Sequence, residues 1–144
     1  MHHIKAHGAL YNLIAKDIRA ATNYISSIEA FTKDVSIYVP CNSAIEQVAR
    51  ERNINIKYEA FADRNYNDDL SLVSRLNKNA IINNSAAVFN HLKQMIETEN
   101  VKTIDKVLVP IKVDTFCIHG DHENSLEILK EITKLLNLQN IQIA

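Results

Sequence analysis

Glycine is almost absent from this chain, which has two glycines in 144 residues. Because glycine adopts a positive φ more readily than any other residue, most turns must form without it. Asparagine tolerates the left-handed region better than most residues, so we expect it at some of these turns. Both glycines directly follow a histidine, in the pairs His7-Gly8 and His119-Gly120. This placement suggests that each glycine lies at the end of a strand, where φ is positive or where another group approaches the backbone closely. The histidine beside each glycine can carry a proton.

A basic surface, long apolar runs and closely spaced cysteines are also lacking. The formal net charge is -1, which provides no basic field for nucleic acid or for an anionic membrane surface. No apolar run approaches the roughly 18–20 residues that span a bilayer, and the N-terminus does not resemble a signal peptide. Cys41 and Cys117 have no Cys-x-x-Cys partner, so we expect reduced thiols. The prediction is a cytoplasmic protein with one domain, residues 1–144, and no nucleic-acid or membrane partner.

The apolar pattern alternates between the period of a strand and that of a helix. It predicts mostly parallel strands covered by helices, hence an α/β fold. The strands are expected at 4–7, 35–39, 54–61, 107–109, 116–119 and 141–143. The helices are expected at about 12–31, through about 50, through about 97 and from about 125 to 136. The expected caps of the last three are Asn42 or Ser43, Asn84 or Ser85, and Asn124. The polar stretch 63–79 is a long connection, and long connections in compact domains are usually functional.

Candidate site residues gather where the predicted strands end, which is where parallel α/β folds place their sites. Side chains alternate between the two faces of a strand, so Lys5 and His7 are expected on one face of the first strand. Cys117, His119 and Asp121 are expected on one face of a later strand. On the central strand Glu59 lies in an apolar run, and a carboxylate is rarely buried without a partner. Each cluster also has an ordinary structural explanation: Glu59 could bond Lys5 or a backbone amide, and Asp63-Arg64 could be a surface ion pair.

The other histidines are interpreted as terminal or helix-surface residues: His2, His3, His91 and His122. Cys117 is interpreted as a small core residue, and Asp68-Asp69 as a solvated turn. From the residues alone, His7, His119, Glu59 and Asp63 could serve as acids or bases, with Lys5 and Arg64 as cations. That set suits attack of water on a carbonyl-type carbon in an anionic substrate. A divalent metal on His7, His119 and Asp121 is an alternative that no short ligand spacing supports.

Three motifs of the chain resemble those of the LamB/YcsF family, which includes the A-type subunit of ATP-dependent 5-oxoprolinase. Ile4 to Asn12 is similar to the family's V-K-P-H-G-A-L-Y-N. The stretch from Glu59 to Arg75 is similar to E-x-F-A-D-R-x-Y-x-D-D-G-x-L-x-x-R. Thr115 to Asp121 is similar to T-x-C-x-H-G-D. The motifs occur in the family's order along the whole chain.

The resemblance implies a partial (β/α) barrel of the glycoside hydrolase/deacetylase type, with about five mostly parallel strands. It implies that the lactam of 5-oxoproline is opened to L-glutamate with ATP, which partner subunits of the B and C type help to handle. The implied catalytic residues are His7, Glu59, Asp63 and His119. The implied substrate-binding residues are Lys5, Tyr11, Asn12, Arg64, Tyr66, Arg75 and Asp121. No metal ligand is assigned.

The chain also departs from the family pattern. Ala6 and Ser74 replace prolines, Leu70 replaces a glycine, and His122-Glu123 replace Asn-Pro. These changes are expected to loosen or re-aim loops. The family's first strands, with N-C-D-L-G-E, H-A-G-D and G-A-H-P, have no counterpart, so the chain resembles the later part of the barrel. We therefore expect the isolated chain to be inactive, and a separately encoded N-terminal half is a possible partner. The alternatives are a non-catalytic remnant or interaction scaffold, and a metal-dependent amide or acetyl hydrolase of this fold.

Overall fold

The computed structural model describes residues 1–121 and 124–142. The chain forms two compact units, one of residues 1–60 with 112–115, and one of residues 61–111 with 116–144. Four strands form a sheet in the order β1 (His3–Ile4), β2 (Ser36–Val39), β3 (Ile56–Phe61) and β6 (Thr115–Cys117). The β1–β2 and β2–β3 pairs are parallel, as the alternation of strands and helices predicts. The prediction of a single domain is not tested by this division and stays a prediction.

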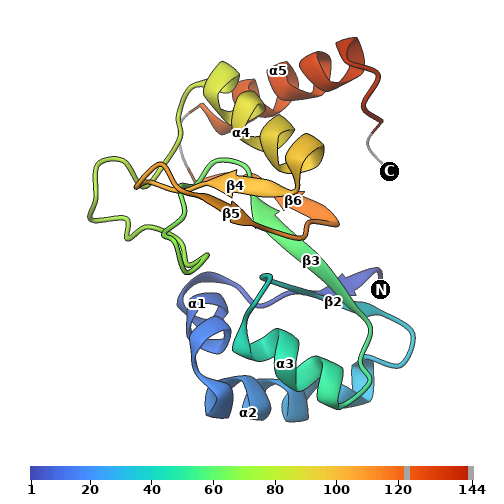
Figure 1. The fold of residues 1–144 in the computed structure, drawn as a ribbon. Helices are drawn as coiled ribbons and strands as arrows, with labels where there is room; N and C mark the ends of the chain where they lie inside the picture. The colour runs from blue at the N-terminus through green and yellow to red at the C-terminus, as the bar shows by residue number, and fades with distance from the viewer. Residues whose placement is uncertain (122–123, 143–144) are drawn as a thin grey trace. The chain divides into compact units, whose positions relative to one another are not determined.

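The first unit places three helices beside its strands, and these helices pack against one another (Figure 1). They are α1 (Gly8–Lys16), α2 (Ile18–Ile28), which continues into the short 3-10 helix η1 (Glu29–Phe31), and α3 (Ala44–Glu51). The prediction of one helix over 12–31 is wrong, because Asp17 has an extended backbone between α1 and α2. Its carboxylate accepts a hydrogen bond from the Ala20 amide at 2.7 Å and thereby caps α2. Of the two predicted caps, Asn42 and Ser43, it is Ser43 that caps α3.

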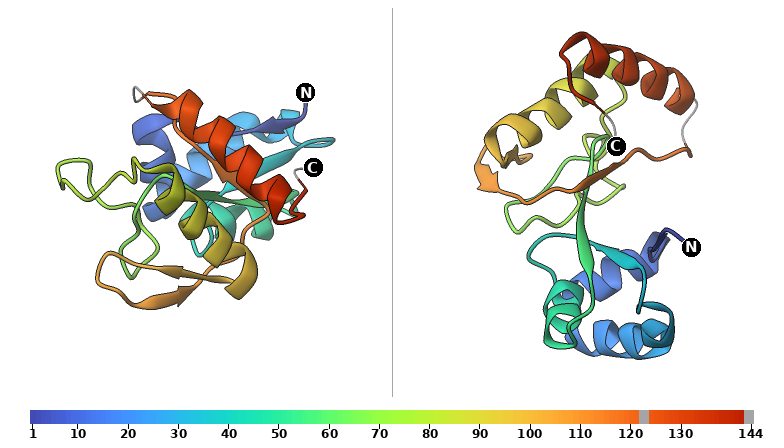
Figure 2. Two further views of the ribbon diagram at one scale, coloured as in Figure 1. Left: turned by 90° about the horizontal axis from the view of Figure 1, so that it is seen from above. Right: turned by 90° about the vertical axis from the view of Figure 1, so that its right-hand side faces the viewer.

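The second unit contains α4 (Ser85–Thr98) and α5 (Ser125–Leu138), which lie side by side in both views of Figure 2. Their apolar faces enclose a buried cluster that includes Val88, Leu92, Ile128 and Ile132. Asn84 caps α4 as predicted, whereas Asn124 makes no side-chain cap. The strands β4 (Asn100–Lys102) and β5 (Leu108–Pro110) form an antiparallel hairpin, and the sequence pattern does not predict the first of these strands.

Two predicted strands are shorter than expected, which changes how their site residues are held. β1 ends at Ile4, so Lys5 and His7 do not share a strand face; His7 is the residue before α1. β6 ends at Cys117, and His119 and Asp121 follow it in irregular backbone. No strand forms at Ile141 and Gln142, and Ile143 lies outside the described residues, as do His122 and Glu123.

The scarcity of glycine has the predicted consequence at three turns. Asn42, Asn53 and Asn140 have positive φ angles of 57°, 56° and 57°. Of the two glycines, Gly8 has a φ of 60°, but Gly120 is not in the left-handed region, and no described atom lies within 4 Å of a Cβ built on it. The positive φ expected at Gly120 is therefore not found, and the alternative of a close approach to its backbone stays a prediction. Cys41 is a buried free thiol, as predicted.

Candidate functional site

A buried carboxylate and a histidine form the core of the candidate site in the second unit. Asp63 follows β3 by two residues and is fully buried, with 0% of its surface exposed. Its carboxylate accepts the backbone amide of His119 at 2.8 Å and lies 3.0 Å from Nδ1 of the same residue. An amide hydrogen bond from Ala62 to the carbonyl of Cys117 joins the two chain segments beside this pair. The structure thus brings together two sequence-predicted catalytic residues that are far apart in the chain.

The electrostatics of this pair determine the state of the imidazole. Burial by itself raises the pKa of Asp63, but the hydrogen bonds from the His119 ring and backbone outweigh burial, and the pKa lies below its usual value. An ionised carboxylate can only accept, so Nδ1 of His119 donates to it and Nε2 is the ring nitrogen that faces away from Asp63. The His119 side chain is 24% exposed and stacks on Phe61, with ring centroids 5.0 Å apart. This arrangement suits a general base that reaches solvent through Nε2.

Arg64 and Tyr66 are buried beside this pair and are bonded to the backbone. The Arg64 guanidinium donates hydrogen bonds to the carbonyls of Val73 at 2.7 Å and Ala80 at 3.2 Å, which fixes the long loop before α4. The Tyr66 hydroxyl accepts the Phe61 amide at 2.7 Å. The alternative of a surface ion pair at Asp63-Arg64 is wrong, because both side chains are buried. The substrate-binding roles of Arg64 and Tyr66 stay predictions.

Arg75 and Asp121 form an exposed ion pair in the same unit. The nitrogen–oxygen distance is 2.7 Å, and the side chains are 49% and 55% exposed. The hydrogen bond from Arg75 holds the pKa of Asp121 below its usual value. An exposed pair of this kind contributes at most about 1 kcal/mol to stability, so either side chain can exchange its partner for a ligand at little cost.

The first unit holds a second cluster around Lys5 and Glu59. Nζ of Lys5 lies 2.7 Å from Oε1 of Glu59, and the side chains are 14% and 4% exposed. The ammonium group is also 5.7 Å from the ring centroid of Tyr11, which is itself buried. This geometry confirms the alternative in which Glu59 bonds Lys5. The other carboxylate oxygen, Oε2, is buried without a hydrogen-bond partner among the described residues.

The remaining predicted residues of the first unit are exposed. His7 precedes α1 and makes no side-chain cap, and Asn12 lies on the exposed face of that helix. Their catalytic and binding roles stay predictions. The predicted site residues therefore divide into one cluster in each unit, with Asp63, His119, Arg75 and Asp121 in the second.

Sequence reasoning misses His91, which it interprets as a helix-surface residue. The residue is 9% exposed, and burial lowers its pKa below the usual value. A signal exists in the sequence, because His91 lies three residues after Val88 and four before Met95 on the buried face of α4. Among residues 1–121 and 124–142, no three histidine, cysteine, aspartate or glutamate side chains gather as metal ligands. No helix in the described part of the chain is long and apolar enough to cross a membrane.

Comparison with known proteins adds the family context of these clusters. A relative described as the A subunit of 5-oxoprolinase, from Acinetobacter baumannii (strain ACICU), is 38% identical over 141 residues, covering 98% of this chain and 56% of the relative. A protein with the same description from Pyrococcus abyssi is 34% identical over 143 residues, covering 99% of this chain and 56% of the relative. The chain therefore spans about half the length of the curated relatives it matches. Because these relatives are described as subunits, their names imply a complex of several chains.

A solved structure supports the fold assignment. The lactam utilization protein from Thermus thermophilus matches 99% of this chain and 57% of its own, with a TM-score of 0.89 and 25% sequence identity. The predicted α/β class is thereby confirmed. The model of the LamB/YcsF family matches residues 1–144. Since that match covers the sequence from end to end, the chain belongs to the LamB/YcsF family.

Proposed function

We propose that this chain acts as the A-type subunit of ATP-dependent 5-oxoprolinase and takes part in the hydrolytic opening of 5-oxoproline to L-glutamate. Family membership and relatives with this description support the assignment. The observation that carries it is the buried Asp63–His119 pair, because lactam hydrolysis needs a base that activates water. The proposed partners are 5-oxoprolinase subunits of the B and C type, and a separately encoded N-terminal half is a further candidate.

In this proposal His119 is the general base and Asp63 positions it. Nε2 of His119 takes a proton from water while the water oxygen bonds to the lactam carbonyl carbon. The carbon–nitrogen bond of the ring then breaks, and the proton passes to the leaving nitrogen. Before this attack, ATP would transfer its terminal phosphoryl group to the lactam carbonyl oxygen and leave ADP, and that group would depart as inorganic phosphate when the carboxylate of glutamate forms; no residue of this chain is assigned to holding ATP. Asp63 keeps the proton on Nδ1 and stabilises the imidazolium that forms.

Charged residues of each unit, taken by itself, are proposed to bind an anionic group. Lys5 is held by Glu59 and the Tyr11 ring, so its ammonium position is fixed before a ligand arrives. Arg75 is exposed and paired with the exposed Asp121, so it can turn to a carboxylate at little cost. His7, Asn12, Arg64 and Tyr66 complete the proposed set.

The test is glutamate formation from 5-oxoproline by the chain assembled with its partner subunits and supplied with ATP. His119→Asn should lower kcat by about 10²–10⁴-fold, because a positioned general base typically contributes that much. His2→Asn, at an exposed terminal position, is the matched control and should leave kcat unchanged. Asp63→Asn should shift the pH dependence of kcat as well as lowering it, since the wrong tautomer is then favoured.

Three other results would each point to a different function. Equal rates of glutamate formation for wild type and His119→Asn would show that His119 is not the general base. A complex that assembles without forming glutamate would favour a non-catalytic scaffold. Amide hydrolysis that requires an added divalent metal but no ATP would favour a metal-dependent amide or acetyl hydrolase.

A further inference from the structure

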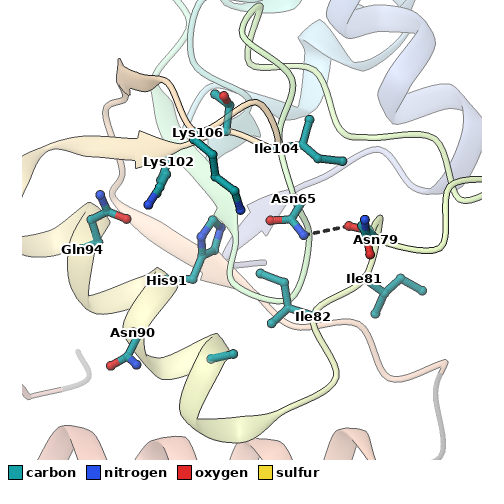
Figure 3. Close-up of a pocket in the computed structure, with 12 residues that line it drawn as sticks. Asn65, Asn79, Ile81, Ile82, Asn90, His91, Gln94, Lys102, Ile104 and Lys106 are labelled. Atoms are coloured by element: carbon teal, nitrogen blue, oxygen red, sulfur yellow. Dashed lines mark hydrogen bonds between the residues drawn. The ribbon is translucent and has the colours of Figure 1, made fainter.

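A cavity of about 730 Å³ lies in the second unit and contains none of the residues assigned to the reaction. Its walls come from α4, from the β4–β5 hairpin and from the loop that precedes α4 (Figure 3). A volume of this size is within the range of pockets that bind small molecules. The proposed hydrolytic reaction therefore assigns no role to this cavity.

The cavity carries positive charge without a compensating acid. Lys102 and Lys106 line it, and no aspartate or glutamate is among its lining residues. Both lysine side chains extend from the hairpin toward α4 in Figure 3. Neither lysine makes an ion pair with a residue that the structure describes. Because both ammonium groups carry positive charge and line the same cavity, they repel each other. An oxyanion bound between them would attract both and offset this repulsion.

His91 adds an unsatisfied hydrogen-bonding atom to the same cavity. Its Nε2 is buried without a hydrogen-bond partner in the part of the chain that the structure describes. Burial lowers the pKa of His91, which leaves the ring neutral, and a hydrogen bond to the Arg64 backbone engages the ring. With Nδ1 donating to that backbone, Nε2 is an acceptor. Buried polar atoms without partners are rare, and a ligand N–H or O–H group would satisfy this one.

Neutral amides surround these groups. Asn90 and Gln94 are four residues apart on α4 and line the cavity on the same side as His91. Asn65 donates from Nδ2 to the carbonyl of Asn79 at 2.7 Å, the contact drawn in Figure 3. Its side-chain position is thus fixed. Amides of this kind can orient a polar ligand without adding charge.

Lys106 has a backbone conformation that is strained for a lysine. Lys106 has a φ of 69°, in the left-handed region that glycine or asparagine adopts more readily. The hairpin turn fixes this conformation, because the Lys106 amide donates to the Thr103 carbonyl at 3.0 Å. Asparagine occupies three other left-handed positions of this chain, so a lysine here is not the structurally preferred choice.

We propose that this cavity binds a small ligand that carries an oxyanion, either phosphate or carboxylate, together with an N–H or O–H donor. Lys102 and Lys106 bind the oxyanion, and Nε2 of His91 accepts the donor. The proposal does not depend on the hydrolytic reaction, because a different set of residues carries it.

The test is titration of the full chain by isothermal calorimetry and by amide NMR. AMP combines phosphate with an amino donor, and N-acetylglycine combines carboxylate with an amide N–H; comparing their affinities distinguishes the two sources of oxyanion. Inorganic sulfate, which carries no O–H group at neutral pH, provides the oxyanion alone. We expect at least one of the first two probes to bind with a Kd below about 1 mM and to shift the amide signals of residues 90–94 and 102–106.

Variants test the lysine contact with the oxyanion and the His91 contact with the donor separately. The double change Lys102→Gln and Lys106→Gln should weaken every probe at least about tenfold, because the charge that attracts the oxyanion is gone. Lys78→Gln, at an exposed loop lysine outside the cavity lining, is the matched control and should leave the Kd unchanged. His91→Phe should weaken the probes that carry a donor but not inorganic sulfate.

One variant keeps the proposal testable if His91→Phe does not fold. Lys106→Gly should raise Tm, because glycine relieves the left-handed backbone, and should weaken binding at the same time. A chain that binds no probe, a Kd unchanged by the double lysine variant, or signal shifts confined to other residues would each overturn the proposal.

Discussion

The most informative perturbation of the candidate site is Asp63→Asn, which keeps the shape of the side chain and removes its charge. Asp63 is fully buried and accepts hydrogen bonds from the amide and the ring of His119. Asparagine can still accept the amide hydrogen bond, and its NH₂ group can donate to Nδ1 of the other imidazole tautomer. Both charge-assisted hydrogen bonds therefore become neutral ones. Hydrogen bonds to charged groups contribute about 1.5–3 kcal/mol, and relief of charge burial offsets part of the loss. We expect a net destabilisation of about 2 kcal/mol at pH 7.

The pKa shift of Asp63 predicts how the stability difference between wild type and Asp63→Asn changes with pH. The folded pKa of Asp63 lies below its unfolded value of about 3.9, so its stabilising contribution is complete above that pH. The contribution is lost as the pH falls through the folded pKa. The difference in unfolding free energy between wild type and Asp63→Asn should therefore persist from about pH 7 to pH 5 and narrow below about pH 4.

Urea denaturation followed by far-UV circular dichroism measures this difference, since the chain has no tryptophan to report by fluorescence. Asp34→Asn makes the same chemical change at an exposed aspartate and should alter stability by less than about 0.5 kcal/mol. A variant as stable as wild type at pH 7, or a difference that is unchanged at pH 3.5, would refute the argument that the ionised carboxylate holds His119.

Two further predictions concern other parts of the chain. Glu99 is exposed and ends α4 with a φ of 51°, so Glu99→Gly should stabilise the protein by about 1 kcal/mol relative to Glu99→Ala, measured as a rise in Tm. An equal Tm for the two variants would contradict this. Glu59→Gln removes the charge of the carboxylate that the part-buried Lys5 contacts and should cost about 3 kcal/mol in urea denaturation. The double variant Lys5→Met and Glu59→Gln should cost less than the sum of the single changes; strict additivity would contradict a coupled pair.

The elements that the sequence predicts well are those with local signals. β2 is a β-branched run that stops at Pro40, and α3 and α4 begin at the predicted caps Ser43 and Asn84. The elements that differ from prediction lack such signals or have competing ones. Asp17 interrupts a continuous apolar stripe by capping a new helix. The β4–β5 hairpin turns through Lys106 in a left-handed conformation that glycine or asparagine normally marks.

The candidate site shows a similar division between local and long-range information. The sequence identifies Asp63 and His119 as candidates, but their contact joins residues separated by 56 positions and depends on the paired ends of two strands. Adjacency along the chain instead suggests that Asp63 pairs with Arg64, which bonds to the carbonyls of the following loop. The pairing of Lys5 with Glu59 is anticipated as an alternative because a buried carboxylate needs a partner.

Leu70 shows why a departure from the family pattern need not disrupt a loop. Leu70 stands where the family motif has glycine, and its φ of 62° is the conformation that glycine adopts freely. The strain for a leucine is about 1–2 kcal/mol. The side chain is only 8% exposed, however, and burying a leucine contributes about 2 kcal/mol. The two terms nearly cancel at Leu70, so the loop can retain this backbone without glycine. At Glu99 the side chain is exposed and no burial offsets the strain, which is why the stabilising effect of glycine is predicted there.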